Sequence, residues 1–211
     1  MIKKKLNEEL DKEDILSMTK EIVETIAFVV VAVIIIRFFI GEIRWIPSGS
    51  MRPTLVEGDR IFVERVSRFY KAPERGDVMI FYPPFTGIDI SFSGVLRRLT
   101  GFGCKDIAYI KRIVGMPGDK VEIRENSDGS HDVLINDKIL EEPYIQSKYE
   151  YIRCNEKMMC GPFVVPEGNY FMMGDNRGNS QDSRFWGLLP GDRFIGRAIF
   201  LFWPLKNIRG L

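Results

Sequence analysis

The stretch Ile-Ala-Phe-Val-Val-Val-Ala-Val-Ile-Ile-Ile (residues 26–36) is an uninterrupted apolar run near the start of the chain. A helix that crosses a membrane needs about 20 mostly apolar residues. The run reaches this length, over residues 22–40, if Glu24 and Arg37 lie near the two membrane surfaces and extend their charged groups into water. The sequence therefore predicts one transmembrane helix over residues 22–40.

Two other interpretations of this run compete with a membrane anchor. A cleaved signal peptide fits poorly, because the twenty residues before the run form a long segment of mixed charge. In addition, no small-x-small cleavage site follows the run. A buried core helix fits poorly as well, because the run is apolar on all sides rather than along one stripe. An uncleaved signal anchor is preferred.

The distribution of basic residues predicts the orientation of the anchor. Positive charge is enriched in cytoplasmic segments that flank a membrane helix. Lysines are slightly in excess before the run, at positions 3, 4, 5, 12 and 20, whereas Arg44, Arg52 and Arg60 follow it. We expect residues 1–21 to be cytoplasmic and residues 41–211 to form an extracytoplasmic domain, with Trp45 as an interfacial anchor.

Beyond residue 45 the hydrophobic pattern changes to short runs rich in Val, Ile, Phe and Tyr, separated by Gly-Asp, Pro-Gly-Asp and Pro-Glu-Gly turns. This spacing predicts a mainly β, antiparallel domain. The predicted strands are Arg60–Val66, Val78–Tyr82, Tyr109–Val114, Lys120–Arg124, Val133–Ile135, Tyr170–Met173 and Ile195–Trp203.

Residues 83–107 fit the strand pattern least well. Within them, residues 94–102 suggest a short amphipathic helix that touches lipid headgroups or substrate, or is simply a surface excursion.

Composition limits the remaining function classes. The 211 residues include 30 Lys and Arg and 29 Asp and Glu, and they form no basic stripe with interleaved aromatics, which argues against nucleic acid as a partner. The three cysteines lack companion ligands at metal-binding spacing, so no metal or cofactor is expected. Cys154 and Cys160 could close a small disulfide loop outside the membrane or stay free thiols in a reducing compartment. Cys104 is expected to be a buried thiol.

Residues 48–55, Ser-Gly-Ser-Met-Arg-Pro-Thr-Leu, follow the apolar segment closely. Gly49 and Pro53 allow a sharp turn that presents the Ser50 hydroxyl beside backbone amides, a geometry that suits a nucleophile. Without a partner for the serine, an ordinary loop that leaves a helix explains the same residues.

The general base for such a serine must be found among a few candidates. The single histidine, His131, lies in a polar run that is typical of a solvent-exposed hairpin turn, so a catalytic role is not expected. Lys111 lies in a strand-like run whose alternation places Tyr109, Lys111 and Ile113 on one face. Burial there lowers a lysine pKa from about 10.4 toward neutrality. Alternation alone leaves open whether Lys111 faces inward for catalysis or only because Arg112 faces outward.

Four segments together resemble, in order, the motifs of bacterial type I signal peptidases, the leader peptidase family of Ser-Lys proteases. The resemblance covers roughly residues 20 to 204. The segments are Ser-Gly-Ser-Met-Arg-Pro-Thr-Leu (48–55), Gly-Asp-Val-Met-Ile-Phe (76–81), Tyr-Ile-Lys-Arg-Ile-Val-Gly-Met-Pro-Gly-Asp (109–119) and Gly-Asp-Asn-Arg-Gly-Asn-Ser-Gln-Asp-Ser-Arg-Phe-Trp-Gly (174–187).

The resemblance implies a role for each matching residue. Ser50 would be the nucleophile and Lys111 the general base, and the Ser48 hydroxyl with the Ser50 amide would form the oxyanion hole. The implied supporting residues are Ser180, which would hydrogen-bond the Lys111 amine, Tyr109 beside that amine, and Asp175, Asp182 and Arg184, which would form ion pairs. Gly178 departs from the family pattern, which commonly has an aspartate there.

The resemblance further implies a membrane-anchored serine endopeptidase that removes signal peptides from exported preproteins after small-x-small sites. Its partners would be signal peptides and the lipid bilayer. Two alternatives are a soluble self-cleaving Ser-Lys repressor-type protease, against which the apolar segment argues, and an inactive membrane-anchored scaffold of the same fold. Ser48, Ser50, Lys111 and Ser180 together argue against the scaffold.

Overall fold

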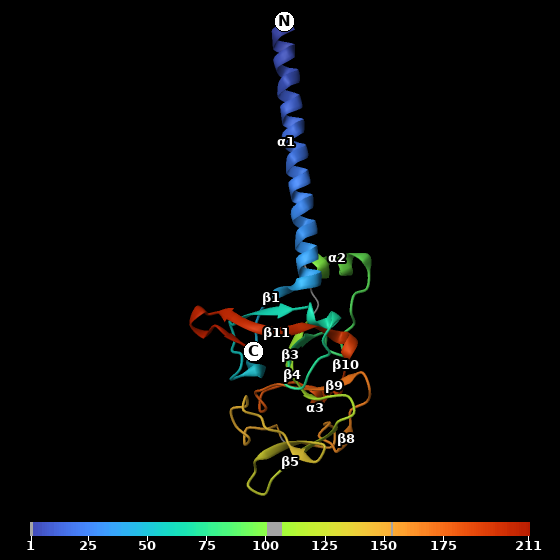
Figure 1. Ribbon diagram of the computed structural model, residues 1–211, viewed down its shortest axis with the longest axis vertical. Helices are drawn as coiled ribbons and strands as arrows, with labels where there is room; N and C mark the ends of the chain where they lie inside the picture. Colours follow the sequence, from blue (N-terminus) through green and yellow to red (C-terminus); the bar gives the residue numbers. More distant parts are fainter. Residues whose placement is uncertain (1, 101–106, 153) are drawn as a thin grey trace.

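The computed structural model describes residues 2–100, 107–152 and 154–211. Its first element is helix α1 (Ile2–Ile35), which continues into a π-helical turn, Ile36–Ile40. The segment Asp14–Ile40 is long and apolar enough to cross a membrane, with a mean hydropathy of 2.6. The helix projects away from the rest of the chain (Figure 1), and its most apolar part is not buried against protein. The predicted N-terminal apolar helix is confirmed, and the helix begins well before residue 22.

The larger of two antiparallel sheets begins with strand β1, directly after this helix. Its eight strands run in the order β1-β2-β11-β3-β4-β9-β10, with β12 paired to β11. The strands are β1 (Gly41–Trp45), β2 (Arg60–Glu64), β3 (Val78–Phe81), β4 (Tyr109–Gly115), β9 (Asn169–Met173), β10 (Leu189–Pro190), β11 (Phe194–Trp203) and β12 (Arg209–Gly210).

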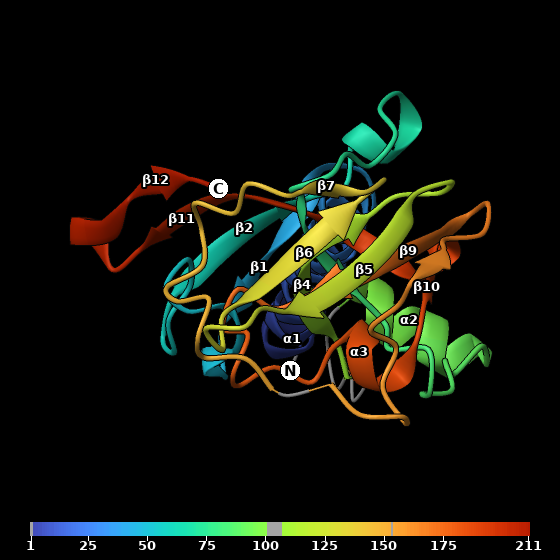
Figure 2. The same cartoon turned by 90° about the horizontal axis from the view of Figure 1, so that it is seen from below.

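The smaller sheet lies at the end of the molecule farthest from α1 (Figures 1 and 2). It has four strands in the order β7-β6-β5-β8. These are β5 (Lys120–Glu125), β6 (His131–Ile135), β7 (Lys138–Ile139) and β8 (Phe163–Val164).

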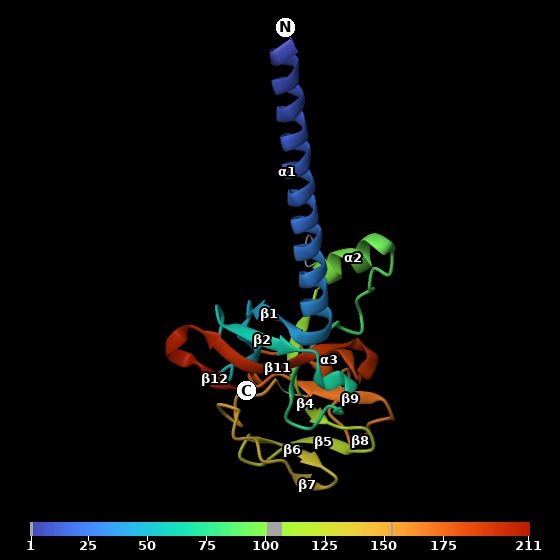
Figure 3. The same cartoon turned by 45° about the horizontal axis from the view of Figure 1, so that its top comes forward.

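Short helices connect the strands. Helix α2 (Phe92–Thr100) lies beside the lower end of α1 (Figure 3), and α3 (Ser183–Trp186) precedes β10. The 3-10 turns are Gly49–Met51, Ser67–Phe69, Gly191–Arg193 and Leu205–Asn207.

The prediction of a mainly antiparallel β domain is confirmed. All seven predicted strands are present, with ends within two residues of those expected. The pattern missed β1, and it missed β7, β8, β10 and β12 because a strand of two residues is too short to show alternation. The predicted amphipathic helix is present as α2 and begins two residues earlier than expected, while its last two expected residues fall outside the described part of the chain.

His131 corrects one prediction. The turn of the β5–β6 hairpin ends at Ser130, and His131 is the first residue of β6 rather than part of an exposed turn. Its side chain is buried because the ring stacks on Tyr151, with centroids 4.8 Å apart and an interplanar angle of 1°. Both ring nitrogens are buried without a hydrogen-bond partner among the described residues. The prediction that His131 is exposed to solvent is therefore wrong.

The hydrophobic core fixes the loop after β1. Met51 and Leu55 are fully buried and pack in one cluster with Ile61 and Val63 of β2. Burying a side chain of this size contributes about 1.5–3 kcal/mol. The loop that carries Ser50 is therefore held against the sheet directly after the serine.

Candidate active site

Ser50 lies at the centre of the 3-10 turn Gly49–Met51. Its side chain is buried, and the Arg52 amide donates to the Gly49 carbonyl at 3.2 Å to close the turn. Asn176 binds the turn from the other side, since its side-chain amide donates to Gly49 O and its backbone amide donates to Ser50 O. The serine is thus held in place by its own turn and by Asn176.

Lys111 reaches Ser50 from strand β4. Its Nζ donates to Ser50 Oγ at 2.7 Å and to the Ile110 carbonyl at 2.9 Å. The amine also lies 5.6 Å from the centre of the Tyr109 ring, and Ile113 is fully buried on the same face. The sequence prediction that these three residues share a face agrees with the structure. Arg112 is also buried, so the open question of which residue faces outward is answered by a strand that is buried on both faces.

Burial of the ammonium group lowers the pKa of Lys111 to about 8, although the negative charges of Asp182 and Asp175 partly offset this effect. Removing an amine from water disfavours its charged form. A substantial fraction of Lys111 is therefore neutral at mildly alkaline pH. A neutral amine within hydrogen-bond distance of a serine hydroxyl can accept its proton.

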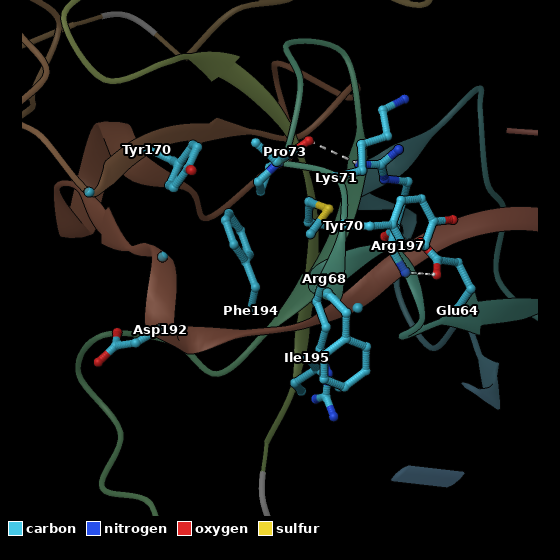
Figure 4. A pocket seen from close by; sticks show the side chains of 17 residues that line it. Glu64, Arg68, Tyr70, Lys71, Pro73, Tyr170, Asp192, Phe194, Ile195 and Arg197 are labelled. Carbon is cyan, nitrogen blue, oxygen red and sulfur yellow. Dashed lines mark hydrogen bonds between the residues drawn. The ribbon is translucent and has the colours of Figure 1, made fainter. Parts of the chain in front are cut away.

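A cavity of about 480 Å³ opens beside the Ser50–Lys111 pair. Its polar lining includes Ser48 and Ser180, and its apolar lining includes Ile107 and Ile152. An extended peptide that enters this cavity meets the serine hydroxyl next to a mostly apolar wall. A larger cavity of about 730 Å³ (Figure 4) has neither Ser50 nor Lys111 in its lining.

Ser180 does not make the contact that the sequence resemblance implies. Its Oγ is buried in the active-site region and has no hydrogen-bond partner among the described residues, so the expected bond to the Lys111 amine is absent. The amine instead donates to the Ile110 carbonyl. Ser180 lies close to Gly174, where an added Cβ would be 2.2 Å from Ser180 Oγ and 2.4 Å from Ser50 O.

Asp182 and Arg184 form the expected ion pair, fully buried and 2.8 Å long. Asp182 also accepts from the Gly174 amide at 3.1 Å and caps α3. The resemblance implies an ion pair for Asp175 but does not name its partner. In the structure, Asp175 pairs with Arg112 of β4, next to Lys111, through contacts of 2.6 and 2.8 Å.

Sequence reasoning missed three charged residues that support this region. Arg112 was expected only as a possible outward residue, because an arginine next to Lys111 does not by itself identify Asp175 as its partner. Arg177 is also buried and contacts Glu142 and the Tyr151 hydroxyl. Glu142 follows β7 in a segment without a recognisable motif, so no signal in the sequence pointed to it.

Gly178, the departure from the family pattern, has a local explanation. An added Cβ would lie 2.9 Å from the Glu150 carbonyl oxygen. An aspartate at this position requires Glu150 to move. The glycine thus allows the backbone at Glu150 to pack closely against residue 178.

Cys154 and Cys160 form a disulfide, with Cα atoms 6.2 Å apart. This answers the question that the sequence left open. The loop between them joins the small sheet to the active-site segment, since Met159 N donates to Arg184 O and Ile123 N donates to Cys160 O. Cys104 falls outside the described residues. In the described part of the chain, no group of three or more His, Cys, Asp or Glu could hold a metal ion.

Known proteins match this chain over most of its length. A family model described as signal peptidase, peptidase S26, matches residues 19–203. Signal peptidase I of Leptolyngbya laminosa is 39% identical over 186 residues, which cover 88% of this chain and 80% of that protein. Signal peptidase I T of Bacillus subtilis is 33% identical over 190 residues, covering 88% and 86%.

A solved structure is also similar. The crystal structure of a signal peptidase I from Enterococcus faecalis V583 aligns with 60% of this chain and 97% of that chain, at 28% identity and a TM-score of 0.41.

Proposed function

The chain belongs to the peptidase S26 family of signal peptidases, and on that basis we propose that Ser50 and Lys111 form the catalytic dyad of a membrane-anchored endopeptidase. As a member of this family it is a hydrolase that acts on the signal peptides of preproteins. The observation that carries the proposal is the 2.7 Å contact between Lys111 Nζ and Ser50 Oγ.

The proposed reaction begins with neutral Lys111. The amine accepts the Ser50 proton while Oγ attacks the carbonyl carbon of the last signal-peptide residue. The resulting oxyanion accepts hydrogen bonds from the Ser50 amide and the Ser48 hydroxyl. Protonated Lys111 then gives its proton to the amine of the mature chain. That amine departs, and the signal peptide stays bound to Ser50 as an acyl-enzyme.

Water completes the proposed cycle. Lys111, neutral again, accepts a proton from a water molecule that attacks the acyl carbonyl, and Ser50 Oγ leaves as the hydroxyl. The lowered Lys111 pKa supports both steps, because each needs a neutral amine. Tyr109 supports them by keeping the amine away from bulk water.

Cleavage after small-x-small sites is part of the proposal. Its support is the family membership and the cavity beside the dyad, whose walls include Ile107, Tyr109 and Ile152. These side chains come from two segments of the chain and give the space an apolar wall, which favours apolar residues over charged ones.

The proposed anchor is the apolar helix, with the N-terminus in the cytoplasm and the β-rich part outside. The length and exposed apolar surface of Asp14–Ile40 support it. A signal peptide presents its cleavage site just beyond its own apolar segment. A serine ten residues beyond the end of the anchor at Ile40 can meet such a site at the membrane surface.

The test is cleavage of a preprotein in detergent by the wild-type chain and by Ser50→Ala. We expect the wild type to release the signal peptide after a small residue, as mass spectrometry of the product would show, and Ser50→Ala to release none. Equal cleavage by both would contradict Ser50 as the nucleophile. Absence of cleavage by a folded wild-type chain would favour the inactive scaffold.

A further inference from the structure

A cavity of about 220 Å³ lies where the apolar helix meets the β-rich part. Three arginines, Arg65, Arg68 and Arg98, line it. Phe38, Tyr82 and Val95 are in its apolar walls. None of the described residues that line the cavity is acidic. Its surroundings therefore attract an anion with an apolar portion.

The Glu42 carboxylate, which pairs with Arg65, is already shared. Arg65 Nη2 lies 3.0 Å from Glu42, whose buried carboxylate also contacts Arg37 at 2.5 Å and Arg44 at 2.6 Å. The single negative charge of Glu42 is thus paired with three guanidinium groups. Arg65 Nε is buried and has no hydrogen-bond partner among the described residues. Arg65 retains positive charge and a donor that Glu42 does not satisfy.

Arg68 has no carboxylate partner in the described part of the chain. Its Nη2 donates to the Phe38 carbonyl at 3.0 Å, and its guanidinium lies 4.8 Å and 4.7 Å from the Phe38 and Phe69 rings. Partial burial and the charge of Arg65 both lower the pKa of Arg68. The two cations therefore repel each other, and an anion between them removes this repulsion.

The position of the cavity indicates where the anion comes from. Phe38 belongs to the segment Asp14–Ile40 that is apolar enough to cross a membrane. Helix α2, which supplies Val95 and Arg98, lies beside the lower end of α1 (Figures 1 and 3). Lipid phosphates lie at the level where a membrane helix leaves the hydrocarbon.

We propose that this cavity binds the phosphate of an anionic phospholipid from the bilayer that holds the helix. The proposal rests on the membrane anchoring proposed above. Arginine suits the role because its planar guanidinium donates two hydrogen bonds to a phosphate. A lipid bound there holds the β-rich part against the membrane surface at a second point besides α1.

The larger cavity gives the headgroup room beyond the phosphate. It shares Arg68, Phe194 and Ile195 with the smaller one. Figure 4 shows Arg68 and Ile195 close together at one end of this cavity, with Phe194 beside them and Tyr170 farther away. A glycerol headgroup whose phosphate lies between the arginines can therefore extend toward Phe194.

The experiment uses the full chain in a neutral detergent, with dihexanoyl phosphatidylglycerol as the probe and dihexanoyl phosphatidylcholine as the zwitterionic comparison. Native mass spectrometry counts bound lipids, and calorimetric titration gives the Kd. We expect one phosphatidylglycerol per chain and weaker binding of phosphatidylcholine. Arg68→Gln should weaken phosphatidylglycerol binding about fivefold to tenfold, and Arg68→Lys, which keeps the charge but lacks the paired donors, should restore only part of it.

Arg124→Gln is the matched control. It removes the same charge from the smaller sheet, where Arg124 is half exposed and pairs with Glu122. We expect it to leave lipid binding unchanged. Arg65→Gln should act like Arg68→Gln, but it also releases Glu42, so Arg68→Gln carries the test. Thermal melts confirm that each variant is folded.

Three outcomes would overturn the lipid site: equal losses in Arg68→Gln and Arg124→Gln, equal affinity for the two lipids, or inorganic phosphate binding as tightly as phosphatidylglycerol. The last would assign the cavity to free phosphate. Peptide cleavage in detergent separates this proposal from the catalytic one. Arg68→Gln should cleave a soluble peptide at the wild-type rate, and a chain that binds lipid without cleaving contradicts only the dyad.

Discussion

Arg112 and Asp175 form a buried two-point ion pair one residue along β4 from Lys111. Arg112 Nε lies 2.8 Å from Asp175 Oδ1 and Nη2 lies 2.6 Å from Oδ2. Thr54 donates to the same carboxylate at 2.5 Å. The pair therefore joins the strand of the base, the loop of the nucleophile and the start of the 174–187 segment.

Asp175→Asn should destabilise the protein, because it leaves the Arg112 charge buried without a counter-charge. Removing one partner of a buried pair costs about 3–5 kcal/mol in free energy of unfolding. Chemical denaturation measures the loss. Asp137→Asn is the control, since its pair with Lys120 is exposed and is worth at most about 1 kcal/mol. Equal losses would show that the buried pair has no special structural role.

The dyad residues should act as a unit. Ser50→Ala and Lys111→Ala should each abolish processing without unfolding the domain, and the double variant should be no worse than either single one. Ser48→Ala should retain weak activity, about 10²–10³-fold below wild type, because one oxyanion donor is lost. Single-turnover cleavage of a preprotein measures all four. Near wild-type processing by Lys111→Ala would contradict the assignment of the base.

The pH dependence of kcat/KM should follow the Lys111 amine. Its pKa is lowered to about 8, and only the neutral form accepts a proton, so the rate should rise about tenfold per pH unit below pH 8 and level off above it. Lys111→Arg should be inactive because arginine stays charged at these pH values.

His131→Phe is the control for this profile. It keeps the ring that stacks on Tyr151 and removes the imidazole. The pH profile should not change. A profile that shifts with His131 and is unaffected by Lys111→Arg would mean that the lysine is only a structural cation.

Gly174→Ala should strongly reduce processing. The added methyl group would lie 2.4 Å from Ser50 O and 2.2 Å from Ser180 Oγ, so the nucleophile turn must move. Gly87→Ala is the matched control, because its added Cβ meets nothing within 4 Å. Peptide cleavage together with a thermal melt separates a displaced serine from a general loss of stability. Unchanged cleavage by Gly174→Ala would show that the turn tolerates the displacement.

Topology is tested by protease added to intact cells. The lysine excess before the apolar segment predicts that the chain beyond residue 45 is digested and that the first twenty residues are spared. Cells opened with detergent provide the control for cleavable sites in both parts. Protection of the part beyond residue 45 in intact cells would contradict an external active site.

Local patterns in the sequence predicted most of the fold. Alternation identified β4 and the longer strands, because each buries a regular set of side chains. It did not identify β1, a five-residue strand with only two large apolar residues, Ile43 and Trp45. It also misplaced His131, because burial there depends on Tyr151, twenty residues later in the chain.

The sequence predicted the residues of the candidate site better than it predicted their contacts. Ser50 and Lys111 lie in motifs, and the structure brings them together as expected. The partner of Asp175 could not be derived, because an ion pair between residues 63 apart depends on how β4 meets the turn after β9. The resemblance implied a bond from Ser180 to Lys111, but the backbone carbonyl of Ile110 accepts from the amine instead.

Strand β1 begins at Gly41, immediately after the helical turn that ends at Ile40, and all five of its residues pair with β2. The helix and the nucleophile loop are therefore joined by a rigid piece of sheet, about 17 Å long, rather than by a flexible linker. Such a connection sets a fixed distance between the helix and the loop. It fixes the position of Ser50 relative to the end of the helix, so under the proposed mechanism the position of a peptide bond along a substrate, and not only the residues around it, would decide whether that bond reaches the serine.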